Sequence, residues 1–300
     1  MAESDVSKNA RALADSGGGM APQQQEHPGA TALMEPAPDH GERSWVGRGR
    51  LEGLRALITG GDSGIGRAVA IAYAREGADV AINYLPAEED DARDTATWIE
   101  KAGRRAVLVP GDLRDEATCG RIVERAVAEL GGLNILVNNA GYHWARGEQG
   151  LRGLTTEALD RAMRTNIYGM LWLTRAALPH LGRGDSIINT TSLQAYDPSV
   201  TMVDYAATKA ALNNITANLA AELGPDGIRV NAVAPGPVWT PLQPATKEPG
   251  AVADMGRDTP LGRIGQPAEL AGAYVFLACP AEASFVSGTV LGVTGGMPVF

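Results

Sequence analysis

The chain of 300 residues has only two cysteines, Cys119 and Cys279, and neither stands in a C-x-x-C spacing. So few cysteines, so far apart, exclude a disulfide framework and a cysteine-based metal or redox motif. We predict that both are small buried side chains. The four histidines are His27, His40, His143 and His180. They lack the spacing of zinc ligands, so we predict no metal site.

Basic residues are also scarce: 26 Lys and Arg stand against 35 Asp and Glu, which gives a net charge of −9. This surface offers little to a phosphate backbone, so we expect no nucleic-acid partner and a small-molecule substrate instead. No apolar run is long enough to cross a membrane, and the first residues lack a basic segment followed by an apolar one. We therefore expect a cytoplasmic protein with no membrane partner.

Large apolar residues are few in residues 1–44, which contain Gly17 to Gly19, Gln23 to Gln25 and four prolines. We predict a flexible arm there. With 44% hydrophobic residues overall, the chain has material for one large core, so residues 45–300 are predicted to form a single catalytic domain.

Short apolar runs alternate with helical patterns through this domain. The predicted strands are residues 55–59, 79–83, 106–109, 135–137, 186–189, 229–233 and 289–293. The predicted helices are residues 67–76, 87–102, 115–130, 155–181, 205–223 and 267–278. This order predicts an α/β fold, a doubly wound parallel sheet of seven strands with helices on both faces. Ligands bind such sheets at the carboxyl ends of the strands.

Residues 235–263 interrupt the alternation with many prolines and glycines. A loop of this length in a compact domain is usually a lid or a binding segment, so we expect substrate contacts there.

A glycine-rich turn, T-G-G-D-S-G-I-G at residues 59–66, joins the first strand to the first helix. Its glycines let backbone N–H groups and the helix N-terminus approach a pyrophosphate; a tight turn that merely needs positive φ is the alternative. Its Asp-Ser pair either contacts the ligand or caps the helix. The candidate cofactor contacts in this turn are Gly60, Asp62, Ser63, Gly64, Ile65 and Gly66.

The tip of the second strand, where such folds distinguish NAD from NADP, reads Asn83-Tyr84. It carries neither an acidic residue for a ribose hydroxyl nor a basic one for a 2′-phosphate. The acidic run at residues 88–91 would repel a phosphate if it lay close, although it also suits a solvated helix start. We expect NAD(H) or NADP(H), with a slight preference for NAD.

Two further strand ends carry candidate cofactor contacts. Asp112 and Leu113 follow the third strand, where the aspartate either accepts from an adenine amine or caps a turn. The fourth strand ends in N-N-A-G at residues 138–141, which suits a backbone close to a ribose; a polar turn is the alternative. From this motif we take Asn139, Ala140 and Gly141 as candidates.

Tyr205 and Lys209 stand four residues apart, on one face of a predicted helix. The lysine ammonium there favours the anionic form of the phenol, and a positively charged nicotinamide beside the pair would add to this field, which would let the tyrosine exchange protons near neutral pH. Ser192, at a strand end 13 residues before Tyr205, joins them as a candidate. Asn166 is a weak helix former inside a helical stretch, so it bonds either a water or the neighbouring backbone.

Together these motifs resemble the short-chain dehydrogenase/reductase family: T-G-x-x-x-G-I-G, N-N-A-G, Asn166, Ser192, Tyr205 with Lys209, and P-G at 235–236, over about residues 51–296. The G-G-D-S-G-I-G turn and the segment preceding residue 54 further resemble a bacterial subgroup labelled glucose and ribitol dehydrogenase-like or general-stress oxidoreductases.

The resemblance implies a single-domain Rossmann fold, a homotetramer and a nicotinamide cofactor. It makes Tyr205 the general acid/base. It also implies that Lys209 binds the nicotinamide ribose and lowers the Tyr205 pKa, that Ser192 positions the substrate oxygen and that Asn166 holds a relay water. It adds Pro235, Gly236, Val238 and Thr240 as cofactor contacts, the last two at the carboxamide. Trp239 either narrows the pocket or packs the lid, and Phe300 either reaches a neighbouring subunit or lies on its own surface.

The sequence thus predicts an NAD(P)-dependent oxidoreductase acting on a small alcohol, aldehyde, sugar or polyol. A reductase of carrier-bound 3-oxoacyl groups is the alternative within enzymes. It would need a basic patch for the acidic carrier, for which only Lys247, Arg257 and Arg263 are near the lid. A non-catalytic nucleotide sensor is the alternative from another class, and it would not need the acid/base residues.

Overall fold

Seven short runs of the chain form the strands of one parallel sheet, in the order β3-β2-β1-β4-β5-β6-β7. The computed structural model describes residues 19–145 and 150–300. The strands are β1 Arg55–Thr59, β2 Asp79–Tyr84, β3 Ala106–Pro110, β4 Ile135–Asn138, β5 Ser186–Thr190, β6 Arg229–Pro235 and β7 Val290–Val293. The sheet confirms the predicted doubly wound fold.

The strand order reverses at β1 and β4, which are neighbours in the sheet but not in the sequence. Ile58 of β1 pairs with Ile82 of β2 on one side and with Val137 of β4 on the other. The connections that leave β1 and β4 run to opposite faces of the sheet, so the carboxyl ends of these strands flank a crevice. The fold therefore places a ligand site at this reversal.

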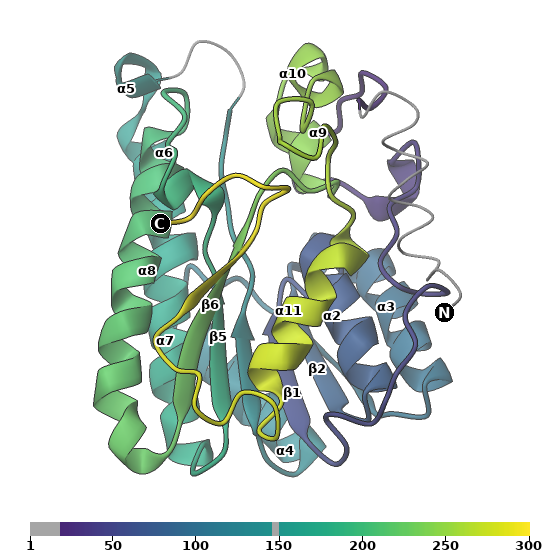
Figure 1. Cartoon of the computed structure of the whole chain (residues 1–300), viewed down its shortest axis with the longest axis vertical. Coiled ribbons are helices and arrows are strands. Elements are labelled where there is room, and N and C mark those ends of the chain that lie inside the picture. Colours follow the sequence, from purple (N-terminus) through teal and green to yellow (C-terminus); the bar gives the residue numbers. More distant parts are fainter. Residues whose placement is uncertain (1–18, 146–149) are drawn as a thin grey trace.

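Helices cover both faces of the sheet (Figure 1). On one face pack α2 (Gly64–Arg75), α3 (Glu89–Lys101) and α11 (Pro267–Ala278). On the other pack α4 (Glu116–Leu130), α7 (Gly169–Ala177) and α8 (Val203–Leu223). Cys279 lies in the first core and Cys119 in the second, and both are free and buried, as predicted.

Polar residues define the ends of these helices. The Asp115 carboxylate caps α4 by accepting a hydrogen bond from the Thr118 N–H at 2.8 Å, and Gly131, with φ of 79°, ends it. At the start of α11, Glu269 Oε2 accepts from the Gln266 N–H at 2.7 Å. These local signals explain why both helices match their predicted ranges closely.

A wide helical turn interrupts the helix predicted for residues 155–181. The segment consists of α6 (Thr156–Met163), the π-helical turn η3 (Arg164–Tyr168), α7 and the 3₁₀ turn η4 (Leu178–His180). Asn166 lies in the π turn, a feature that sequence periodicity does not reveal.

The predicted lid contains two short helices, α9 (Leu242–Thr246) and α10 (Pro249–Ala253). Trp239 is fully buried beside Met20 and Met34, and its indole N–H donates to the Pro36 carbonyl at 2.8 Å. Trp239 therefore packs the lid against the N-terminal segment, and the idea that it narrows the pocket is wrong.

The prediction of a flexible arm does not hold for residues 19–44, which pack on the domain. Met20 and Met34 are buried with Trp239. The Thr31 N–H donates to Asp91 Oδ2 of α3 at 2.8 Å, and the Gln25 N–H donates to the Pro244 carbonyl of α9 at 2.9 Å. Two buried methionines and these hydrogen bonds hold the segment on the domain, although it is poor in apolar residues. The rest of the predicted arm, residues 1–18, lies outside the described residues.

The remaining short elements are η1 Thr31–Leu33, η2 Pro86–Glu88, α5 Gly150–Gly153, η5 Leu193–Ala195 and η6 Gly224–Asp226. None of the helices in the described ranges is both long enough and apolar enough to cross a membrane.

Candidate functional site

A pocket at the carboxyl ends of the strands gathers most of the predicted site residues. They are Gly60, Asp62, Ser63, Gly64, Ile65, Asn83, Tyr84, Asp112, Leu113, Asn139, Ala140, Gly141, Ser192, Tyr205, Lys209, Pro235, Gly236, Val238 and Thr240. The predicted residues that do not line it are Gly66 and Asn166. The glycine-rich turn and the tyrosine–lysine pair thus share one crevice.

The glycine-rich turn forms a cradle that side chains would fill. Gly60 and Gly64 have positive φ, 60° and 51°, and a Cβ on Gly64 would stand 2.9 Å from Thr240 Cγ2. A Cβ on Gly66 would stand 1.8 Å from the Gly60 carbonyl oxygen, so Gly66 serves helix–strand packing and not the pocket wall. Ser63 is the N-cap of α2, but its side chain makes no capping hydrogen bond. The cradle fits a dinucleotide pyrophosphate.

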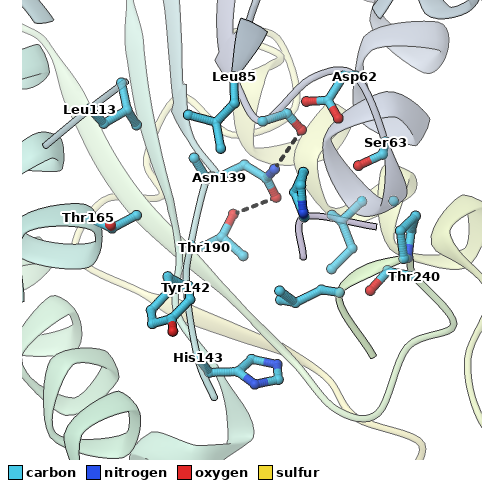
Figure 2. A pocket seen from close by; sticks show the side chains of 18 of the residues that line it. Asp62, Ser63, Leu85, Leu113, Asn139, Tyr142, His143, Thr165, Thr190 and Thr240 are labelled. Carbon is cyan, nitrogen blue, oxygen red and sulfur yellow. Dashed lines mark hydrogen bonds between the residues drawn. The ribbon is translucent and has the colours of Figure 1, made fainter. Parts of the chain in front are cut away.

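Asn139 fixes this turn to the end of β4. Its amide nitrogen donates to the carbonyls of Thr59 at 3.0 Å and Gly60 at 3.2 Å. Its Oδ1 accepts from the Thr190 hydroxyl at 3.4 Å (Figure 2). One side chain therefore ties together the carboxyl ends of β1, β4 and β5. The neighbouring Gly141 lies beside Lys209, where a Cβ would stand 3.4 Å from the lysine Nζ, in ordinary van der Waals contact.

Two carboxyl groups approach the pocket beside the tip of β2. Asp62 is 2% exposed, and its Oδ2 has no hydrogen-bond partner in the part of the chain that the structure describes. Burial, and then the nearby Glu88 charge, hold the Asp62 pKa well above its usual range. Burial also raises the pKa of Glu88 to about 6. Glu88 lines the pocket, so the solvated helix start expected for residues 88–91 does not describe this residue.

The other strand-end residues mostly secure the walls. The Asn83 amide donates to the carbonyls of Val109 at 3.1 Å and Gly111 at 3.0 Å. The Tyr84 hydroxyl donates to Glu89 Oε2 at 2.5 Å. The hydrogen bond from Arg114 holds the Asp112 pKa below its usual value, and Asp112 also accepts from the Arg114 N–H at 2.9 Å. Asp112 thus adopts the turn role that the sequence left open, while still lining the pocket.

Tyr205, Ser192 and Lys209 lie together in the wall of the pocket. The Lys209 ammonium donates to the Thr190 carbonyl at 2.7 Å and lies 5.4 Å from the centre of the Tyr205 ring. Burial raises the pKa of Tyr205, against a smaller lowering by its hydrogen bond with Ser192. Burial also lowers the pKa of Lys209 to about 7. In the protein alone, desolvation dominates both groups and outweighs the lowering of the Tyr205 pKa expected from Lys209, so that lowering stays a prediction for the cofactor-bound enzyme.

Asn166 lies behind this wall. Its Oδ1 accepts from the Tyr142 N–H at 2.8 Å, and its amide nitrogen donates to the Tyr142 carbonyl at 2.9 Å and to Thr208 Oγ1 at 3.0 Å. The side chain thus holds the segment after β4 against α8, next to Lys209. It bonds backbone, but that of a distant segment and not of its own helix.

The pocket also has walls that the sequence argument missed. The N-terminal segment contributes His27 and Pro28, and α6 contributes Arg161, whose guanidinium stacks 4.1 Å from the centre of the Tyr142 ring. His143 and the lid residue Gln243 line it as well. Proximity to the N-N-A-G motif was a signal for His143, whereas only the fold brings the N-terminal segment here.

Comparisons with known proteins show what the chain is similar to. Residues 60–298 match the family model described as enoyl-(acyl carrier protein) reductase. The chain is 51% identical over 280 residues to an uncharacterized oxidoreductase, YhxD, of Bacillus subtilis, over 92% of this chain and 93% of that one. It is 42% identical over 287 residues to the glucose and ribitol dehydrogenase of Daucus carota, and the match covers 94% of this chain and 98% of that one.

Solved structures show the same fold with nicotinamide cofactors. A short-chain dehydrogenase from Burkholderia cenocepacia in complex with NADP matches with a TM-score of 0.77 and 40% identity, over 83% of this chain and 99% of that one. A 3-ketoacyl-(acyl-carrier-protein) reductase from Brucella melitensis complexed with NADH matches with a TM-score of 0.74 and 34% identity, over 83% of this chain and 100% of that one.

Proposed function

Because the chain belongs to the short-chain dehydrogenase/reductase family, we propose that it moves a hydride between a nicotinamide cofactor and a small alcohol, aldehyde, sugar or polyol. The observation that carries this proposal is the meeting of Ser192, Tyr205 and Lys209 with a glycine cradle in one pocket. A cradle alone would support only binding, whereas the buried phenol adds a group that can exchange a proton with a substrate.

Each of the four catalytic candidates has a role in this proposal. The nicotinamide ring supplies or accepts the hydride, and the protein handles the proton. The Tyr205 phenol protonates the carbonyl oxygen during reduction and removes the alcohol proton during oxidation. The Ser192 hydroxyl holds the same oxygen, and the Lys209 ammonium stabilises the phenolate. Asn166, in its π turn, would hold the relay water through the second acceptor position of Oδ1, because both of its amide N–H groups already donate to Tyr142 and Thr208.

Cofactor contacts follow the walls of the pocket. The turn from Gly60 to Ile65 would hold the pyrophosphate. The backbone from Asn139 to Gly141 would run alongside the ribose, next to Lys209. Val238 and Thr240 would hold the carboxamide.

We propose NAD(H) as the preferred cofactor. The unpartnered Oδ2 of Asp62 and the adjacent Glu88 suit the hydroxyls of a ribose, and neither Asn83 nor Tyr84 supplies a positive charge. A 2′-phosphate placed there would meet two carboxyl groups. Steady-state rates should therefore give a kcat/KM at least about 10-fold higher with NAD(H) than with NADP(H), a difference of about 1.4 kcal/mol. A preference for NADP(H) would contradict this assignment.

Reduction of a carrier-bound 3-oxoacyl group is less well supported. An acidic carrier needs free cations near the lid. Arg263 is paired with Glu269 at 2.7 Å, and Arg257 with Asp254 at 2.9 Å. Both arginines thus have acidic partners within the chain, and burial lowers the pKa of the third lid cation, Lys247, so the lid offers little positive charge to an acidic carrier and favours a small uncharged substrate.

A homotetramer is part of the proposal. Half-exposed apolar side chains lie along the segment from α6 to α8, on the outer side of one helical layer. They are Leu159, Met163, Tyr168, Leu171 and Val203. Phe300 is fully exposed and so does not lie against its own chain's surface, which leaves contact with a neighbouring subunit as its proposed role. Such a face suits burial against another copy of the chain.

The direct test is a panel of aldehydes, polyols and sugars assayed with both cofactors at the nicotinamide absorbance. We expect turnover with members of the aldehyde or polyol panels. Tight cofactor binding without turnover on the panel would favour the nucleotide sensor, and turnover confined to 3-oxoacyl thioesters would favour the carrier-dependent alternative.

A further inference from the structure

His143 occupies a position beside the catalytic candidates that the proposed mechanism does not use. It follows the N-N-A-G motif by two residues and is 4% exposed. It lines the pocket described above and also an adjoining cavity of about 580 Å³ under the lid, whose walls include Ser192 and Tyr205. Its ring stands edge-on to the Tyr205 ring, with the centroids 5.1 Å apart. Figure 2 shows the ring projecting from the segment after β4.

The hydrogen bonds around Thr246 fix the tautomer of His143. The Thr246 hydroxyl donates its single proton to the Leu242 carbonyl at 2.6 Å, within α9. Its oxygen lies 3.2 Å from His143 Nδ1 and can then only accept. Nδ1 therefore carries the ring proton, and Nε2 keeps its lone pair.

The only hydrogen-bond contact of the His143 ring within residues 19–145 and 150–300 is that of Nδ1, and Nε2 is not among the fully buried atoms without a partner, so Nε2 opens on the cavity. Burial, with the nearby charges of Lys247 and Lys209, lowers the pKa of His143 to about 3, so the ring is neutral at pH 7. A second acceptor lies on the same walls: Gln243 of α9 has a buried Oε1 with no partner among the described residues. Two acceptors without donors thus line the same pocket and cavity as Tyr205, and a buried polar atom such as Gln243 Oε1 normally has a partner.

We propose that His143 Nε2 accepts a hydrogen bond from a substrate hydroxyl close to the reacting carbon, with Gln243 Oε1 as a second acceptor. The site would then select hydroxyaldehydes, sugars and polyols over unsubstituted aldehydes and alcohols. This inference rests on the proposed function and specifies its substrate class. A site built around buried acceptors discriminates against an analogue that lacks the hydroxyl, because the acceptors then stay unpaired.

The test compares two substrates of equal carbon number, glyceraldehyde and propanal, through the ratio of their kcat/KM values. Wild type should prefer glyceraldehyde by at least about 10-fold. His143→Phe, which keeps a ring against Tyr205 but removes the acceptor, should lower that ratio about 10-fold. His143→Gln, which restores a carbonyl acceptor, should recover part of it. Gln243→Leu should also lower it.

His180→Phe makes the same exchange on an exposed histidine and is the matched control, expected to leave both rates unchanged. A ring that only supports Tyr205 would lower both rates of His143→Phe equally, so an unchanged ratio would overturn the proposal. A wild-type preference for propanal would also overturn it.

Binding separates a failure of this inference from a failure of the proposed function. If neither these two aldehydes nor any member of the aldehyde, polyol and sugar panel turns over, the proposed function fails, and the holoenzyme is examined by saturation-transfer NMR with glycerol and 1,3-propanediol, which differ by one hydroxyl. Stronger binding of glycerol in wild type than in His143→Phe would support the acceptor role. An equal preference for glycerol over 1,3-propanediol in wild type and His143→Phe would contradict the acceptor role.

Discussion

Burial governs the proton affinities of Tyr205 and Lys209 at the scale of single residues. It raises the pKa of the phenol and lowers that of the ammonium to about 7, so both neutral forms are favoured in the cofactor-free protein. The Thr190 carbonyl, 2.7 Å from Nζ, holds the lysine in place in either state. Burying the Lys209 amine therefore lowers the stability of the fold when this group is charged, at the site where the proposed chemistry needs it.

Lys209→Met tests this burial through stability. Between pH 7 and 10.5 the unfolded chain binds a proton at Lys209 that the folded chain binds more weakly, so this residue makes the free energy of unfolding rise with pH. From pH 7 to pH 9 the cofactor-free wild type should gain about 2 kcal/mol relative to Lys209→Met in urea unfolding. Parallel changes in the two proteins would show that Lys209 is not desolvated.

Sequence spacing identified Tyr205 and Lys209 as candidates because a helix fixes the distance between positions four apart, and Ser192 because it stands at a strand end 13 residues before Tyr205. It did not identify Glu88 as a pocket residue, since an acidic helix start resembles any solvated one. It also did not anticipate that burial raises the pKa of Tyr205 in the cofactor-free protein, because a linear sequence reports neighbouring charges but not the loss of water around a buried phenol.

At the scale of elements, the first turn of α2 depends on close contact with the end of β1. A Cβ on Gly66 would meet the Gly60 carbonyl oxygen at 1.8 Å, and backbone cannot yield as a flexible side chain can. The position of the cradle thus depends on a residue that does not line it.

Gly66→Ala should therefore weaken cofactor binding by more than about 10-fold and lower the free energy of unfolding by more than about 1 kcal/mol. Gly120→Ala is the matched control, because Gly120 lies within α4 and a Cβ there meets nothing within 4 Å. That variant should bind cofactor normally and gain roughly 0.5–1 kcal/mol of stability. Calorimetric titration and urea unfolding measure both effects; equal behaviour of the two variants would refute the packing argument.

Strands and helices with local signals were predictable, because the alternation of apolar runs with helical patterns and the capping residues depend on neighbouring positions in the sequence. The π turn was not, because Asn166 is held by Tyr142 and Thr208, which are distant in sequence. The packing of residues 19–44 was also missed, because Met20 and Met34 reach a Trp239 that local composition cannot place.

At the scale of the whole molecule, the half-exposed apolar side chains from α6 to α8 are the surface that the proposed tetramer would use. Leu171→Glu places a charge on this face and should shift the mass measured by light scattering toward smaller species. Val46→Glu is the control, because Val46 is 78% exposed and outside this face. An unchanged assembly in Leu171→Glu would exclude α7 as its interface.

The central claim, that the Tyr205 phenol exchanges the substrate proton, is tested most directly by Tyr205→Phe, with turnover and cofactor affinity measured on the same protein. The account predicts a fall in kcat of about 100-fold or more with the cofactor still bound. Tyr168→Phe, which removes the same atom from a half-exposed tyrosine, should keep wild-type turnover. Turnover of Tyr205→Phe within a few-fold of wild type would contradict the account.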